Sequence, residues 1–128
     1  MPVDLQKFTQ KIFSVDDKIR WFAVLDKETI AKKFEKYAPG VKPLTPNPHE
    51  RRTIIERLGT SLRESYKKQR YGEIKYILKS YENIDVLIFP AGRYVFTITS
   101  QPQALSGIIL KITPILNDLK DKMEVELW

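Results

Sequence analysis

Two kinds of hydrophobic spacing alternate along this chain. Near the start, Leu5, Phe8 and Ile12 recur at the spacing of one helix face, and Asp4 stands where a helix N-cap is expected. Residues 19–25 are almost continuously apolar and rich in aromatic and β-branched side chains. Such a run predicts a central strand covered on both faces. A short helix and a buried strand are therefore expected in the first 25 residues.

The next segment, residues 30–37, follows a turn at 26–29 and is much more polar. It predicts a second strand, whose charged side chains would protect a sheet edge from further pairing. These side chains are Lys32, Lys33, Glu35 and Lys36. A helix over the same residues is the competing interpretation, and the sequence leaves both open.

A proline-bearing loop at 38–46 precedes the strongest local signal in the chain. Asn47 is suited to an N-cap, Pro48 to the first helical position, and Glu50 completes an arrangement like a capping box. A long helix is therefore expected over residues 50–70, and Gly72 is suited to its left-handed cap.

Residues 73–128 predict three strands and a helix. The strands are expected at residues 73–81, 85–89 and 94–99, joined by short turns as a meander. The helix is expected to open near residues 100–102 and to kink at Pro114. Its apolar face comprises Leu105, Ile108, Ile109, Ile112, Leu116 and Leu119. Residues 124–128 are expected to form a tail or a short added strand.

The predicted order is helix, two strands, helix, three strands, helix. This is an α+β fold in which helices cover a single antiparallel sheet of about five strands. The order of elements and the segment at residues 18–27 resemble the roadblock/longin-like domains of the profilin-like group. The same segment, the long capped helix and the strand pair that ends with the apolar run at 86–90 resemble a family of small archaeal proteins.

The roadblock resemblance implies a non-enzymatic module that forms dimers. In that family, dimers commonly extend the sheet across an edge strand and pack the long middle helices together, and many members regulate or scaffold small GTPases. Here these roles fall on the strand at 73–81 and the helix at 50–70. The candidate residues for a homodimer interface are Gly59, Tyr66, Lys75, Tyr76 and Lys79. The long loop at 38–46 and the kinked last helix depart from the family.

Composition limits the chemistry. A chain of 128 residues is the length of one domain, so a single domain over residues 1–128 is expected. There is no cysteine and only one histidine, His49, which excludes disulfides, thiolate metal sites and multi-histidine sites. No run is long and apolar enough for a bilayer span or a signal peptide. We expect a cytoplasmic protein with no cofactor, no metal and no enzymatic activity.

The net charge of +6 is concentrated in the first 70 residues. On the predicted middle helix, Arg52, Arg63 and Arg70 lie 11 and 7 residues apart and so share one flank, with Lys67 beside them. This flank would suit an anionic protein surface or a nucleic-acid backbone. The alternative is a solvated face, because glutamates are interspersed with these basic residues.

Two further groups have a functional and a structural interpretation. Aromatic side chains on the predicted strands would serve either as a base-stacking platform or as core. They are Trp21, Phe22, Phe89, Tyr94 and Phe96. Asp16 and Asp17 would serve as a metal-binding or acid–base pair, or as solvated or capping groups. Core packing and capping are the favoured interpretations. A nucleic-acid-binding protein and a small-ligand sensor remain the alternatives to an interaction module.

Overall fold

The computed structural model describes residues 4–29, 31–42, 72 and 74–126. Within these ranges the chain forms an antiparallel sheet and two helices. The elements are α1 (Leu5–Phe13), β1 (Ile19–Asp26), β2 (Lys32–Tyr37), β3 (Ile77–Ser80), β4 (Asp85–Ala91), β5 (Tyr94–Ser100) and α3 (Ala104–Glu126). The α+β prediction is confirmed, and residues 32–37 are a strand rather than a helix. The expected middle helix lies outside the described residues.

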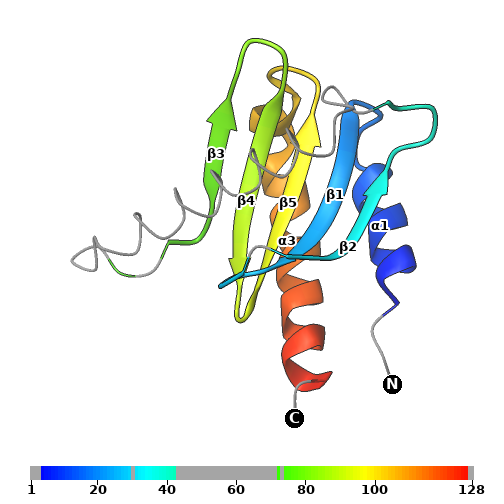
Figure 1. Cartoon of the computed structure of the whole chain (residues 1–128). Helices are drawn as coiled ribbons and strands as arrows, with labels where there is room; N and C mark the ends of the chain where they lie inside the picture. The colour runs from blue at the N-terminus through cyan, green and yellow to red at the C-terminus, as the bar shows by residue number, and fades with distance from the viewer. Residues whose placement is uncertain (1–3, 30, 43–71, 73, 127–128) are drawn as a thin grey trace.

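The five strands are arranged in the order β2-β1-β5-β4-β3, and every neighbouring pair is antiparallel (Figure 1). β3, β4 and β5 form the expected meander. β1 lies beside β5, with Phe22 opposite Ile98 and Val24 opposite Phe96. The sheet centre therefore joins a strand from the first quarter of the chain to one from the last. The apolar run of β1 is buried on both faces, as its composition predicts.

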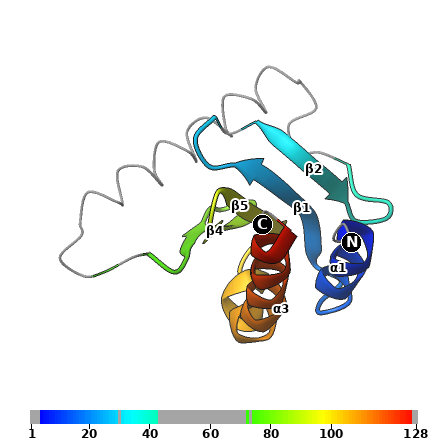
Figure 2. The same ribbon diagram turned by 90° about the horizontal axis from the view of Figure 1, so that it is seen from below.

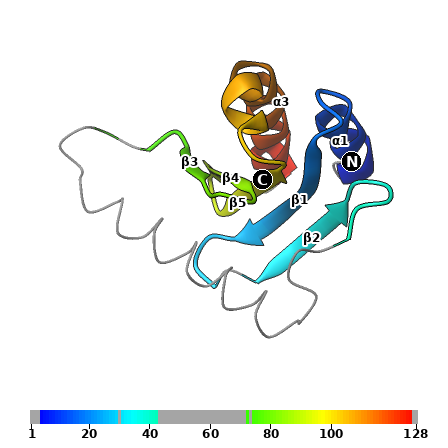
Figure 3. The same cartoon turned by 90° about the horizontal axis from the view of Figure 1, so that it is seen from above.

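Both described helices cover the same face of the sheet, α1 beside β1 and α3 against β4 and β5 (Figures 2 and 3). One hydrophobic cluster joins α1, α3 and this face. Its fully buried members include Ile12, Phe22, Phe96, Ile112 and Leu116. The ring of Phe8 lies at the margin of this cluster, where the ammonium groups of Lys11 and Lys122 lie 4.9 and 5.1 Å from its centroid. The main core therefore lies between the sheet and these two helices.

A second, smaller cluster lies on the other face of the sheet. Trp21, Leu25 and Ile88 are buried there, and the ring of Tyr37 packs 6.2 Å from the Trp21 ring, centroid to centroid. The aromatic residues considered above as a stacking platform are thus mostly core residues. Trp21, Phe22, Phe89 and Phe96 are all buried, and Tyr94 is half-buried.

Local sequence signals explain where several elements begin and turn. Asp4 accepts a hydrogen bond from the backbone N–H of Lys7 at 3.1 Å and so caps α1, as expected. Asp16 likewise accepts the backbone N–H of Lys18 at 2.7 Å. Gly92 begins the two-residue turn between β4 and β5 with a φ of +64°, a backbone conformation that favours glycine. Gly72 also has a positive φ, +84°, but the helix that it is expected to cap lies outside the described residues.

Two expectations about the C-terminal helix are wrong in their limits. α3 begins at Ala104 rather than near residues 100–102, after a turn in which Gln103 has a φ of +68°. It also continues through residues 124–126, where a tail or a strand was expected. Pro114 lies inside this helix, at the position where a kink is expected. The apolar face is as expected, with Leu105, Ile112 and Leu116 fully buried.

Candidate interaction surface

The β3 edge is the part of the described sheet best suited to an additional strand. β3 lies at one end of the sheet, where β4 is its neighbour (Figure 1). Tyr76 and Tyr81, which flank it, are 43% and 52% exposed. Within the strand, Leu78 packs against the core beneath α3, and Ile77 packs against the cluster on the opposite face. The edge therefore presents a strand that is anchored on both faces of the sheet.

The opposite edge is protected by charge. Four of the six residues of β2 are lysine or glutamate, and all four are exposed. Charged side chains on an edge strand discourage pairing with another chain, since pairing would bring them together and remove their water. β3 carries one charged residue, Lys79. The two edges thus differ, and β3 is the one with the weaker protection.

β3 is shorter than the expected strand at 73–81. It pairs with β4 from Ile77 opposite Ile88 to Ser80 opposite Asp85. If the same register continued, Lys75 would lie opposite Pro90. Proline has no N–H to donate to a ladder, and this explains why the pairing ends at Ile77. Lys75 and Tyr76 therefore precede the strand rather than belong to it, which corrects the expectation.

The other end of β3 is held by a polar anchor. The Ser80 hydroxyl donates to Asp85 Oδ1 at 2.8 Å, and the Tyr81 N–H donates to the Ile84 carbonyl at 2.9 Å across the turn. Asp85 is fully buried, and its second carboxylate oxygen has no hydrogen-bond partner. This carboxylate fixes the hairpin between β3 and β4 and with it the position of the edge.

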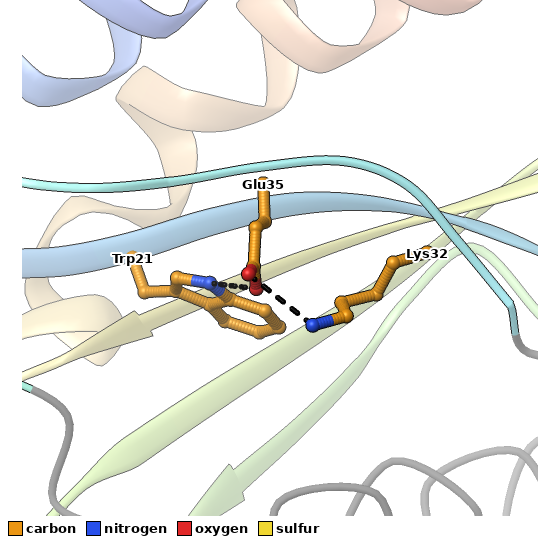
Figure 4. Close-up of polar contacts among 3 residues, drawn as sticks. All are labelled: Trp21, Lys32 and Glu35. Carbon is orange, nitrogen blue, oxygen red and sulfur yellow. Dashed lines mark hydrogen bonds and ion pairs between the residues drawn. The ribbon is translucent and has the colours of Figure 1, made fainter. Parts of the chain in front are cut away.

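A second polar cluster lies where β1 meets β2 (Figure 4). The indole N–H of Trp21 donates to Glu35 Oε2 at 3.2 Å, and Lys32 Nζ lies 3.2 Å from Glu35 Oε1. Lys32 and Glu35 are three residues apart, so a regular strand would place them on opposite faces. The pairing skips Lys33, since Val24 pairs with Phe34 and Leu25 with Lys32. This bulge brings the two charges to one face.

No protein-family model matches the sequence, and no curated protein matches it. Solved structures do resemble it. A roadblock/LC7 domain from Streptomyces avermitilis superposes with a TM-score of 0.67 at 8% identity, covering 98% of each chain. The gliding protein MglB from Thermus thermophilus gives 0.66 at 11% identity, covering 95% of this chain and 94% of that one. A structure described as MglB with tetrameric arrangement gives 0.67 at 12% identity, covering 94% of this chain and 90% of that one.

This chain has the roadblock/longin-like fold. At such low identity the likeness is one of fold alone. It confirms the resemblance given by the order of elements and by the apolar strands. It assigns no residue a role, so the expected interface remains a prediction.

Only some of the expected site residues can be placed in this roadblock/longin-like fold. Lys79 lies on β3, as expected, whereas Lys75 and Tyr76 precede the strand. The remaining candidates fall outside the described residues, as does His49. They are Gly59, Tyr66, Arg52, Arg63, Lys67 and Arg70. The described residues therefore include three of the candidate residues, and their role in an interface stays a prediction.

Two observations bear on other functions. Within the described part of the chain, no three histidine, aspartate or glutamate side chains gather in a way that could hold a metal ion. None of the helices described here is long and apolar enough to cross a membrane.

One surface feature was missed by the sequence analysis. Leu110 on α3 is 86% exposed, the highest value among the large hydrophobic residues of the described chain that are exposed. The signal was present, because residues 104–116 carry apolar side chains around the whole helix rather than on one face.

Proposed function

We propose that this chain is a non-enzymatic interaction module that forms a homodimer through the β3 edge and acts with a protein partner such as a small GTPase. The difference between the two sheet edges is the observation that carries the dimer. The resemblance to roadblock domains, many of which regulate or scaffold small GTPases, supports the choice of partner. A fold neighbour with a tetrameric arrangement supports self-association.

The side chains of β3 favour one register for such a dimer. In an antiparallel pair of strands, residues directly opposite each other have side chains on the same face of the sheet. A two-fold axis that relates two copies of β3 must therefore lie where a residue is opposite its own copy. An axis at Leu78 places Lys75 opposite Tyr81 of the second copy. Axes at Ile77 or Lys79 place one lysine opposite another, which is unfavourable. We therefore propose that Leu78 lies opposite Leu78 of the second copy.

Cysteine cross-linking tests the edge and the register together. The chain has no cysteine of its own, so each variant carries a single thiol. Leu78→Cys is expected to form a disulfide dimer faster than Ile77→Cys or Lys79→Cys, because only the residue on the axis meets its own copy at bonding distance. Lys33→Cys on β2 is the matched control. Equal cross-linking at Lys33, or a monomer at high concentration by sedimentation, contradicts the proposal.

The partner is tested separately with purified small GTPases from the same host, loaded with GDP or with a non-hydrolysable GTP analogue. We expect calorimetry to detect binding that depends on the bound nucleotide. Absence of binding across the set removes the GTPase part of the proposal and leaves the dimer intact.

The rival is a nucleic-acid-binding function, suggested by the net charge of +6. Titration with DNA and RNA at two salt concentrations decides this, since phosphate-driven binding is strongest at low salt. Binding that weakens steeply with salt would favour the rival.

A further inference from the structure

The outer surface of α3 carries an apolar stripe that the fold leaves in solvent. Gly107, Leu110 and Pro114 are three and then four residues apart, so they follow one another along one side of the helix. All three are exposed, and Leu110 is 86% exposed. The opposite side of α3 is buried against the sheet through residues such as Leu105 and Ile112. The stripe therefore faces away from the core.

The composition of this stripe is unfavourable for a solvated helix. Glycine and proline are the poorest helix formers, and a leucine on an outer surface gains nothing from burial. A Cβ placed on Gly107 would meet no atom within 4 Å, so packing within this chain does not require a glycine there. Pro114 has no N–H, which removes the usual helical donor from the Leu110 carbonyl. Packing within the described fold explains none of these three residues on the outer side of α3.

The charges beside the stripe are arranged with opposite signs at its two ends. Lys111 and Asp118 are seven residues apart and so share one flank of α3. Both are exposed, and Asp118 Oδ2 also lies 3.2 Å from Lys122 Nζ. Asp121 is exposed on the same outer side as the stripe. The outer surface of α3 is thus apolar with one lysine in its first half, and its second half carries Asp118 and Asp121 together with Lys122, which pairs with Asp118.

This pattern is complementary to itself in the antiparallel direction. We propose that the outer face of α3 docks on the same face of a second copy of this chain, with a two-fold axis just before Pro114. Leu110 then packs against Pro114 of the second copy, and Lys111 lies beside Asp118 of the second copy. The symmetry repeats each contact, so both apolar side chains and both charge pairs are satisfied.

This surface is separate from the β3 edge. α3 lies on one face of the sheet, whereas β3 lies at its margin (Figure 3). The two surfaces can therefore be used at once, and the assembly can grow beyond two copies. A contact between two single helices is small compared with a stable interface of about 1,200 Å² or more. We expect the association to be weak, with a dissociation constant on the order of 100 μM.

Sedimentation velocity over a concentration series tests the apolar contact. The intact chain is expected to form a larger species as its concentration rises. Leu110→Ser is expected to weaken this association about tenfold or more, since each two-fold contact loses two leucine side chains. Gln10→Ser, at an exposed position of α1, is the matched control and should leave it unchanged. Equal association of the Leu110→Ser variant and the control overturns the proposal.

A charge exchange tests the antiparallel geometry. Lys111→Glu places a glutamate beside Asp118 of the second copy, and Asp118→Lys places two lysines together, so each variant alone should associate more weakly. The double variant Lys111→Glu with Asp118→Lys should recover association. Within one helix, positions 111 and 118 are two turns apart. The ion pair between Asp118 and Lys122 is absent from the single Asp118→Lys variant and from the double variant alike. Recovery therefore cannot come from within one chain, and failure to recover overturns the proposed geometry.

The disulfide at Leu78 separates this inference from the proposed function. Cross-linking of Leu78→Cys should be equally fast with or without Leu110→Ser, because the two surfaces are distinct. Loss of the β3 dimer with retention of the α3 contact contradicts the proposed function alone. Loss of cross-linking in the Leu110→Ser background contradicts the independence of the two surfaces.

Discussion

Trp21 on β1 donates its indole N–H to the Glu35 carboxylate on β2, with 3.2 Å between Nε1 and Oε2 (Figure 4). Trp21 is 8% exposed, so its N–H has little access to water. Glu35 therefore satisfies a donor that would otherwise be buried without a partner. The contact depends on the bulge at Lys33, which sets the position of the Glu35 side chain relative to β1.

Removal of this acceptor should cost more than removal of the ion pair beside it. Glu35→Ala is expected to lower the free energy of unfolding by about 1–2 kcal/mol, since it leaves the indole N–H unpaired. Lys32→Ala should change it by less than about 0.5 kcal/mol, because its pair with Glu35 is exposed. Urea unfolding followed by circular dichroism measures both. Equal effects would show that Glu35 stabilises the fold through its ion pair with Lys32 rather than through its hydrogen bond with the Trp21 indole.

The buried Asp85 carboxylate should be strongly coupled to Ser80. Ser80→Ala is expected to cost about 1–3 kcal/mol, because it removes the hydrogen bond to Oδ1 while Oδ2 already has no partner. The double variant Ser80→Ala with Asp85→Ala should then cost less than the sum of the two single changes. A double-mutant cycle in urea gives this coupling, and additive effects would contradict it.

Truncation of a side chain should lower the free energy of unfolding much more on the buried side of α3 than on its outer side. Leu116 is fully buried, so Leu116→Ala is expected to cost about 2–5 kcal/mol through lost burial and the cavity left behind. Leu110→Ala should change stability by no more than about 0.5 kcal/mol, because Leu110 is 86% exposed. Both are measured by thermal and urea unfolding at low protein concentration. A large cost at Leu110 would mean that this side chain stabilises the single chain.

Asp26 should give the hairpin between β1 and β2 a pH-dependent contribution to stability. Its Oδ1 accepts the backbone N–H groups of Thr29 and Glu28 at 3.0 and 2.9 Å. The hydrogen bond from Thr29 is the main cause that holds the pKa of the Asp26 carboxyl below its ordinary value. The folded state then binds fewer protons than the unfolded state. The contribution is complete above the unfolded pKa of about 3.9 and is lost as the pH falls through the lowered folded value.

An NMR titration of the Asp26 carboxyl checks this expectation directly. Asp26→Asn keeps an oxygen acceptor and should remove the acid dependence of this turn. A titration midpoint at or above the ordinary aspartate value would contradict the role of these hydrogen bonds.

Local signals predict most of the described secondary structure. The cap at Asp4 and the apolar run of β1 depend on residues close in sequence, and each is where the sequence places it. The strand expected at 85–89 continues to Ala91, so the turn before β5 comprises only Gly92 and Arg93. The charged strand β2 could not be separated from a helix by its own residues. Its identity as a strand depends on pairing with β1, which its sequence does not encode.

Several of the errors arise where one element depends on a distant one. The strand expected at 73–81 is shortened because Pro90, on the neighbouring strand, would lie opposite Lys75. The bulge at Lys33 and the bond from Trp21 to Glu35 likewise require the register of two strands. For the candidate site, the sequence indicated the β3 edge through Tyr76 and Lys79. It did not single out Leu110, since an apolar residue in an apolar helix is expected to be core.

The pairing of β1 with β5 has a consequence for the protein during synthesis. Phe22 and Val24 leave the ribosome long before Ile98 and Phe96, which flank them in the finished sheet. Until then β1 has β2 beside it on one edge but lacks β5 on the other, so the nascent chain exposes part of an apolar segment, a state that invites capture by chaperones or aggregation. A fragment that ends before Tyr94 should remain in that state, because it lacks β5, the strand with which β1 pairs at the centre of the sheet.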